Sequence, residues 1–222
     1  MDLRHDPLRP PWRPPLGPGS PGQPPLPPEL PTSEGVPPWL QERLFDQRMV
    51  VITGSLNDDA ATRAAAALMT LDTLGSEPVR LQLATPDGDL AAAFGLIDVI
   101  DTMSAPVHAV VTSLAGGAAV GLLAAAARRL AYRHARIRLS EPRAASVSGT
   151  ADEVAAAAGQ YLRELEELAV RIATATGQPR SRIEDDLSAG RMLTAEQAKE
   201  YGLLDEIIGP DHAQGGAGQT SG

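Results

Sequence analysis

The sequence predicts an α/β protein with a parallel sheet. The main observation is the alternation of strand-like and helix-like stretches. Short apolar runs with the composition of buried strands alternate with longer stretches of helical periodicity along residues 48–142. Parallel strands require long crossover connections, so this alternation is typical of a parallel sheet with right-handed crossovers. A further helical pattern, Ala151–Thr176, would extend roughly 39 Å.

The first half of the alternating pattern contains two strands and three helices. The folded part begins near Trp39 with a short helix that runs into an apolar strand, Arg48–Thr53. The run Asn57-Asp58-Asp59 can cap the next helix, Ala60–Leu74, because such side chains accept hydrogen bonds from a helix N-terminus. The remaining elements of this half are the strand 79–84, the turn Thr85–Asp89 and the helix Leu90–Met103.

The stretch Val107–Pro142 follows, and it is the centre of the pattern. Its first part, His108–Val111, supplies a partly β-branched strand. Gly116 and Gly117 then allow a sharp turn with little side-chain obstruction. The helix Ala118–Arg128 is apolar enough to be buried on most sides, and it carries no side chain suited to nucleophilic or acid–base chemistry. A basic corner and a second strand, which ends in Ser-Glu-Pro, complete the stretch.

The long helix Ala151–Thr176 is predicted to be amphipathic. Its charged residues lie outside an apolar stripe, and Gly177 ends the pattern. The stripe contains Val154, Tyr161, Leu165, Leu168 and Ile172.

Composition excludes several classes of function. The 222 residues can form one sizeable core plus a tail. The absence of cysteine excludes disulfides, thiolate catalysis and the usual zinc frameworks. A formal charge of −9 argues against a nucleic-acid partner, because phosphates would be repelled. The sequence contains no long apolar run and no apolar signal core, so we expect a soluble, cytoplasmic protein without a membrane partner.

The two ends of the chain differ in composition from the predicted domain, residues 39–209. Residues 1–38 hold 14 of the 20 prolines and almost nothing to bury, so we expect disorder or polyproline II structure. This extension reads either as a linker or as a Pro-rich binding arm. Residues 210–222 read as a flexible tail.

No cofactor or metal site is expected. Gly116, Gly117 and Gly121 follow a strand, but the middle glycine of a dinucleotide-binding loop is replaced by Ala118. No Gly-Lys-Ser/Thr phosphate loop is present. The acidic run Glu184–Asp186 reads as a solvated helix face rather than a metal site.

Several stretches resemble the Clp protease proteolytic subunit family, peptidase family S14, which has a crotonase-like fold. Leu44–Gly54 is similar to the strand that opens that family's domain, and Ala84–Gly88 is similar to its Asn-Ser-Pro-Gly-Gly turn. Leu193–Ile208 follows the family most closely. The resemblance covers about residues 44–208 and implies repeated β-β-α units with a projecting handle helix, Ala151–Thr176.

The resemblance also implies a Ser-His-Asp triad, and this chain lacks all three residues. The position of the nucleophilic serine falls on Gly117, with Gly116 as an alternative because the helix-to-strand corner is about two residues shorter here. The histidine position falls on Ser140 and the aspartate position on Gly190.

A displaced triad is the alternative. Ser113 and His134 precede the nucleophile and histidine positions, but nothing in the sequence places their side chains within the ~3 Å that proton transfer requires. We expect His134 at a surface corner, His108 on a strand facing solvent or an interface, and Ser140 as a polar residue at a strand end.

Two backbone groups of the implied oxyanion hole remain possible. The resemblance assigns its donors to the N–H groups of Gly88 and Ala118, and a backbone donor tolerates changes of side chain. The family's first turn glycine is replaced by Asp87, whose carboxylate would oppose a developing oxyanion.

The resemblance further implies seven-membered rings that stack through the handle helix, formed as homo- or hetero-oligomers with Clp proteolytic subunits. An ordinary core helix is the alternative reading of Ala151–Thr176. In the family, aromatic residues help form the cleft that receives the unfoldase ATPase. The matching positions are Arg80, Gln82 and either Thr102 or Met103, so docking of an unfoldase would lose much of its apolar contact.

The sequence therefore predicts a catalytically inactive Clp-protease-like subunit with a structural or regulatory role in a ring-shaped assembly. The main alternative is an active ATP-dependent Clp serine endopeptidase subunit, through a rebuilt site or together with a catalytic paralogue. A further alternative is an acyl-group enzyme of the enoyl-CoA hydratase superfamily, which shares this fold and its paired backbone donors.

Overall fold

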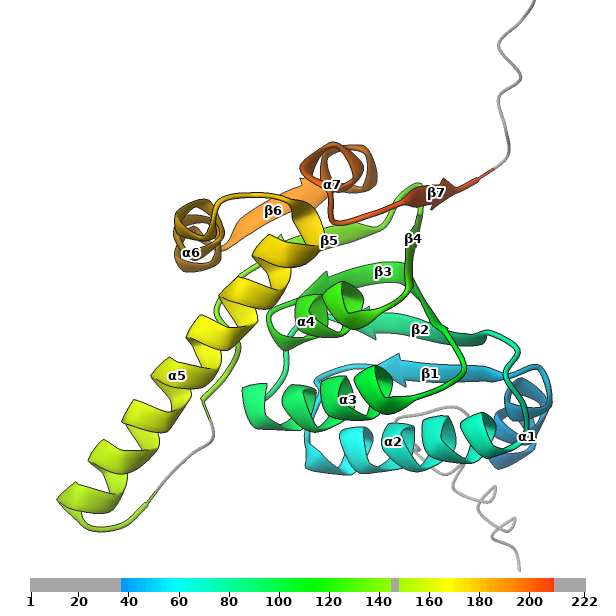
Figure 1. Ribbon diagram of the computed structural model, residues 1–222, viewed down its shortest axis with the longest axis horizontal. Helices are drawn as coiled ribbons and strands as arrows, with labels where there is room; N and C mark the ends of the chain where they lie inside the picture. Colours follow the sequence, from blue (N-terminus) through cyan, green and yellow to red (C-terminus); the bar gives the residue numbers. More distant parts are fainter. Residues whose placement is uncertain (1–36, 145–147, 210–222) are drawn as a thin grey trace, which may run out of the picture. The chain divides into compact units, whose positions relative to one another are not determined.

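The computed structural model describes residues 37–144 and 148–209 (Figure 1). The predicted Pro-rich extension, apart from its last two residues, and the predicted tail 210–222 lie outside these residues. None of the helices in the described part of the chain is long and apolar enough to cross a membrane.

A seven-stranded sheet forms the centre of the fold. Its strands are Met49–Thr53 (β1), Val79–Thr85 (β2), Val107–Gly116 (β3), Arg128–Tyr132 (β4), Arg136–Leu139 (β5), Arg191–Thr194 (β6) and Glu206–Ile208 (β7). β1, β2, β3, β4 and β7 pair in that order and run parallel. β5 pairs in parallel with the end of β3 and antiparallel with β6. The α/β class is confirmed, but the sheet is mixed rather than wholly parallel.

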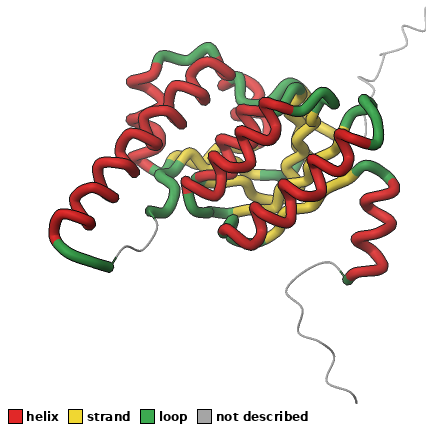
Figure 2. The backbone as a smooth tube through the Cα atoms, turned by 60° about the horizontal axis from the view of Figure 1, so that its bottom comes forward, coloured by secondary structure: helices red, strands yellow, loops and turns green. Residues whose placement is uncertain are grey.

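Helices cover one face of this sheet. The described helices are Pro38–Asp46 (α1), Asp58–Thr73 (α2), Leu90–Thr102 (α3), Ala118–Ala125 (α4), Ala151–Thr176 (α5), Arg180–Ala189 (α6) and Ala195–Tyr201 (α7). Figures 1 and 2 show α2, α3 and α4 side by side on the same side of the strands. Fully buried leucines from both layers form the core, among them Leu68, Leu81, Leu83, Leu96 and Leu122. Burial of this apolar surface is the main force that holds the layers together.

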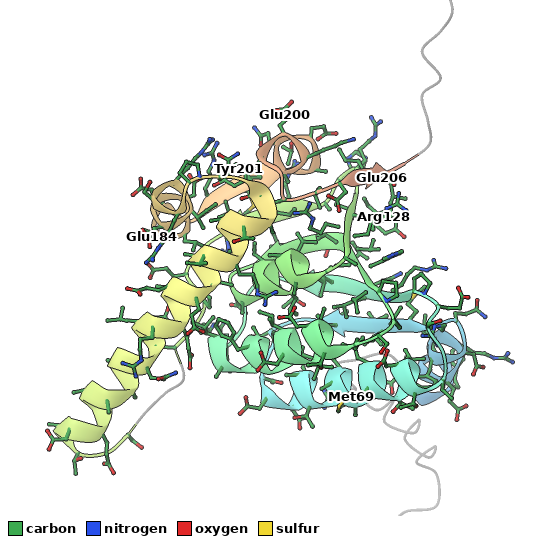
Figure 3. The ribbon with its side chains drawn as sticks, in the orientation of Figure 1. Met69, Arg128, Glu184, Glu200, Tyr201 and Glu206 are labelled. Carbon is green, nitrogen blue, oxygen red and sulfur yellow. The ribbon has the colours of Figure 1, made fainter. Side chains whose placement is uncertain are left out.

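The region after Gly117 differs from the prediction. α4 ends at Ala125 rather than at residue 128, and the predicted basic corner is strand β4. The arginines of β4 have acidic partners near the C-terminus: Arg128 forms an ion pair with Glu206 on β7 (Figure 3), and the Arg129 N–H donates to Asp205 over 2.8 Å. These partners lie 78 and 76 residues further along the chain, so a local pattern does not contain them.

The long helix α5 has the bounds that its sequence predicts. Thr150 begins it with a capping box, and Gly177 ends it in the left-handed conformation. The apolar stripe is buried only towards the C-terminal end, at Leu168 and Ile172, whereas Val154 is 44% exposed. Figure 1 shows the N-terminal half of α5 extending beyond the helices that cover the sheet.

Candidate active site

The junction between β3 and α4 is the first part of the candidate site. Gly117 lies there, is buried, and has φ +53° and ψ −123°. Residues with a Cβ rarely adopt a positive φ, so a glycine avoids strain at this turn. Neighbouring strands fix the position, because β3 pairs with β2 on one side and with β4 and β5 on the other.

Of the two glycines at this junction, only Gly117 has room for a side chain. A Cβ on Gly116 would lie 2.3 Å from the Pro86 carbonyl oxygen, a backbone atom that cannot easily move. A Cβ on Gly117 would have its nearest neighbour, Pro142 Cα, at 3.4 Å, which is an ordinary contact. The steric environment therefore favours Gly117 over Gly116 as the position predicted to match a nucleophile.

The ends of β5 and β6 bring Ser140 and Gly190 next to this junction. Leu139 of β5 pairs with Arg191 of β6, so Ser140 and Gly190 lie opposite each other one residue beyond the pair. The N–H of Gly117 donates to the Arg138 carbonyl at 3.3 Å, which joins the same end of β5 to β3. Three positions far apart in sequence therefore meet at one end of three neighbouring strands.

The side chains at these positions lack the groups of a serine hydrolase. Gly117 and Gly190 have none, and Gly190 is a helix C-cap with φ +66°. Ser140 is half-buried, and its hydroxyl has no hydrogen-bond partner among the described residues. One hydroxyl remains, without a base to take its proton or an acid to orient that base.

Two backbone N–H groups flank Gly117. Ala118 follows it as the first residue of α4, and Asp87, which precedes Gly88, has its Cα 3.8 Å from the position of a Cβ on Gly117. Within the described residues, neither the Gly88 nor the Ala118 N–H donates a hydrogen bond. Free amides beside a helix N-terminus can stabilise a negatively charged oxygen.

Comparison with known proteins identifies the family. Residues 38–211 match the family model described as Clp protease. The chain belongs to the Clp protease family. A curated relative, "ATP-dependent Clp protease proteolytic subunit 2" of Rhodococcus jostii (strain RHA1), is 32% identical over 181 residues, which are 80% of this chain and 92% of that protein. The predicted resemblance to Clp proteolytic subunits is therefore confirmed at the level of the family.

The sequence predicts that the Asp87 carboxylate opposes an oxyanion. In this Clp protease family member, that carboxylate has a positively charged partner. It forms an ion pair with Arg143. The Asp87 side chain is 26% exposed and that of Arg143 is 61% exposed, so water partly screens the pair. The guanidinium offsets part of the negative charge beside the two free amides. The expected repulsion is correspondingly weaker.

A second arginine supports the turn that carries Gly88. Arg138 Nη2 donates to the Pro86 carbonyl at 3.0 Å, and Arg138 Nε is buried without a partner among the described residues. No sequence motif points to a role for Arg138 or Arg143. Their partners lie 52 and 56 residues away, so no short motif contains both members of either pair.

The candidates for a displaced triad do not meet at this site. Ser113 is exposed on β3, four residues before Gly117. His134 is exposed in the turn between β4 and β5. His108 is half-buried, near the start of β3 and away from the Gly117 end, where it pairs in register with Arg80 of β2.

The acidic run on α6 is a solvated face only in part. Glu184 and Asp185 are exposed, as predicted, but the prediction is wrong for Asp186, whose side chain is 14% exposed. Asp186 accepts hydrogen bonds from Arg191 and from the Tyr201 hydroxyl, at 3.0 and 2.6 Å. Burial and the Asp186 carboxylate raise the pKa of Tyr201 well above its usual range. Asp186 therefore connects α6 to β6 and α7.

A separate cavity of about 820 Å³ lies between α3, α4 and α5. Its lining includes Phe94, Asp98, Ala124, Val170 and Arg171, and none of the positions that meet around Gly117. The cavity is therefore distinct from the candidate active site.

Proposed function

We propose that this chain is a catalytically inactive paralogue of the Clp protease proteolytic subunits, with a structural or regulatory role in a ring-shaped Clp assembly. One observation carries the proposal: the strand ends that meet beside α4 bear Gly117, Ser140 and Gly190. Serine hydrolysis needs a nucleophilic oxygen, a base and an acid that orients the base. Loss of nucleophile and base together removes the mechanism rather than slowing it.

The remaining role is assembly. Members of the Clp protease family typically form heptameric rings, and we propose that this chain joins such a ring, alone or with other proteolytic subunits, in the cytoplasm. The exposed apolar residues Val154, Leu162 and Val170 on α5 support a role for this helix in contacts between subunits. Under this proposal α5 is the handle through which rings stack.

Direct docking of an unfoldase is not part of the proposed role. The positions that match the family's docking aromatics are an exposed Arg80, a half-buried Gln82, an exposed Thr102 and a half-buried Met103. Aromatic anchors in apolar pockets supply much of the affinity of such contacts, and charged or small polar side chains cannot replace them. We propose that an unfoldase reaches this subunit only through a partner subunit.

An active serine endopeptidase subunit is the second candidate, and the free N–H groups of Gly88 and Ala118 favour it. A peptidase of this kind would act through a rebuilt site or beside a catalytic paralogue. Within the chain, Ser113 and Ser140 are the serines that a rebuilt site would use.

Native mass spectrometry of the chain alone, and mixed with its host's other Clp subunits, tests both candidates. Peptide cleavage and labelling by a fluorophosphonate serine probe are measured on the same samples. Mixed rings, with no cleavage or labelling by the lone chain, are the expected result. Cleavage by a pure homo-oligomer that Ser113→Ala or Ser140→Ala abolishes would overturn the proposal and reveal a rebuilt site.

A further inference from the structure

Two chain segments meet over Gly117. One is the turn Thr85–Asp89 and the other is Glu141–Arg143, directly after Ser140. A Cβ on Gly117 would lie 3.4 Å from Pro142 Cα and 3.8 Å from both Asp87 Cα and the Glu141 oxygen. The position of a former nucleophile is therefore bordered by both segments at contact distance, and Gly117 itself is buried.

The two segments are joined directly to each other. The Arg143 N–H donates to the Gly88 carbonyl at 3.0 Å, and the Leu90 N–H donates to the Arg143 carbonyl at 3.3 Å. The side chains of Arg143 and Asp87 form an ion pair across the same junction. From α5, the Tyr161 hydroxyl donates to the Pro142 carbonyl at 2.8 Å and holds the second segment in place.

We propose that the Asp87–Arg143 ion pair is a latch that holds the two segments together over Gly117. An extended peptide binds a strand edge through the edge's own N–H and C=O groups. Here the N–H and C=O of Arg143 and the C=O of Gly88 are occupied within the chain. A peptide strand therefore reaches Gly117 only after the two segments separate. This inference rests on the proposed function only in treating Gly117 as a former catalytic position.

The interactions that join the two segments differ in how easily they are broken. The two backbone hydrogen bonds between the segments form one isolated bridge, Asp89 with Arg143, rather than a continuous ladder. The Arg143 side chain is 61% exposed, so salt and substitution weaken the ion pair readily. Loss of an exposed pair of this kind changes an open–closed equilibrium by roughly two- to five-fold. The latch is therefore adjustable rather than permanent.

Thiol labelling can measure the separation of the two segments, because the chain contains no cysteine that would add a background signal. Gly117→Cys places a thiol at the covered position, and Ser140→Cys provides a second probe where Gly117→Cys fails to fold. The rate of reaction with iodoacetamide, an uncharged reagent, is measured at several pH values so that it can be normalised to the thiolate fraction. Each probe is combined with Asp87→Asn, with Arg143→Gln, and with the charge swap Asp87→Arg plus Arg143→Asp.

We expect Asp87→Asn and Arg143→Gln each to raise the normalised rate about two- to five-fold, and the charge swap to return it to the original value. The parent in these comparisons is the cysteine probe variant with no other substitution. Added salt should raise the labelling rate of this parent and leave the rate unchanged in the probe variant that also carries Arg143→Gln. Asp59→Asn, which removes the exposed ion pair with Arg63 on α2, is the matched control and should have no effect. An exposed reporter, Ser181→Cys, should react equally in all backgrounds.

Equal labelling rates in the parent and both single variants would overturn the latch, and so would a charge swap that labels as fast as they do. Neither outcome depends on hydrolysis. Peptide cleavage by the unmodified chain would instead overturn the proposed function and leave the labelling comparison intact, so the two failures are distinguishable.

Discussion

The C-terminal region and the site around Gly117 differ in how far polar side chains contribute to them. Near the C-terminus, Arg129 donates to Asp205 and to the Ala175 and Gly202 carbonyls, so one guanidinium joins β4, the end of α5 and the segment before β7. Around Gly117 the strands and free amides are in place, but the side chains that would perform chemistry are absent. Under the proposed function, the strands and free amides of this site are retained without catalytic side chains.

The sharpest test of this difference introduces the side chains of a Ser-His-Asp triad at the three predicted positions. Gly117→Ser, Ser140→His and Gly190→Asp together return a nucleophile, a base and an acid to positions that meet at one place. We expect a fluorophosphonate probe to label the triple variant about 10²–10⁴-fold faster than Gly117→Ser alone, the usual contribution of a positioned base. Gly117→Ala in the same background is the control. Equal labelling of the single and triple variants would show that the scaffold no longer positions the groups.

The next largest effect is expected from the C-terminal region. Arg129→Ala removes the guanidinium that pairs with Asp205 and leaves two backbone carbonyls without their donor, while Asp205 keeps its hydrogen bond from the backbone N–H of residue 129. This change should lower the free energy of unfolding by about 3 kcal/mol. Chemical denaturation measures the change. Arg63→Ala, which removes an exposed pair with Asp59 on α2, should cost about 0.5 kcal/mol or less. Similar losses for the two variants would mean that the Arg129 interactions contribute little to stability.

A comparison of two helix-capping glycines sharpens the contrast further. Both Gly202 and Gly190 have positive φ, +93° and +66°, so an alanine at either position introduces strain of about 1 kcal/mol. A Cβ on Gly202 would also lie 2.4 Å from the Thr176 oxygen, whereas Gly190 has open space. We expect Gly202→Ala to cost about 1–2 kcal/mol more than Gly190→Ala in thermal or chemical unfolding. Equal losses of unfolding free energy in the two variants would mean that steric crowding at Gly202 does not distinguish it from Gly190.

The elements that sequence reasoning predicts well are those with local signals. The bounds of α5 follow from Thr150 and Gly177, because a capping box and a left-handed glycine are visible within a few residues. The buried face of α2 follows likewise from the helical spacing of Ala64, Leu68 and Leu71.

The elements that it misses depend on distant partners. The sequence of β4 predicts a basic corner because no residue nearby in the sequence balances its arginines. Their partners, Asp205 and Glu206, lie far along the chain. The antiparallel pairing of β5 with β6 likewise joins segments about 50 residues apart. At the candidate site, motif matching predicts Gly117, Ser140 and Gly190 as the triad-equivalent positions, and this stays a prediction. The pairing of Asp87 with Arg143 becomes visible only in the fold.

The smallest expected effect concerns acid stability. Burial by itself would raise the pKa of Asp205, but hydrogen bonds from the Arg129 side chain and N–H, with the nearby guanidinium charges, hold that pKa below its ordinary value. The unfolded chain therefore binds a proton at a higher pH than the folded chain. The stabilisation is present above about pH 4, near the ordinary pKa of an aspartate, and is lost as pH falls through the lower folded value.

Unfolding curves recorded between pH 7 and pH 3 should therefore show a loss of stability in the parent that is smaller in Asp205→Asn. Because the Asp205 side chain is 37% exposed and partly screened, we expect this difference to be below about 1 kcal/mol. Asp59→Asn, at an exposed helix position, should follow the parent across the whole range. An Asp205→Asn curve parallel to the parent would mean that the Arg129–Asp205 contact stabilises the fold without depending on the carboxylate charge. Hydrogen bonding, which an asparagine side chain can retain in part, would then be the main contribution of this residue.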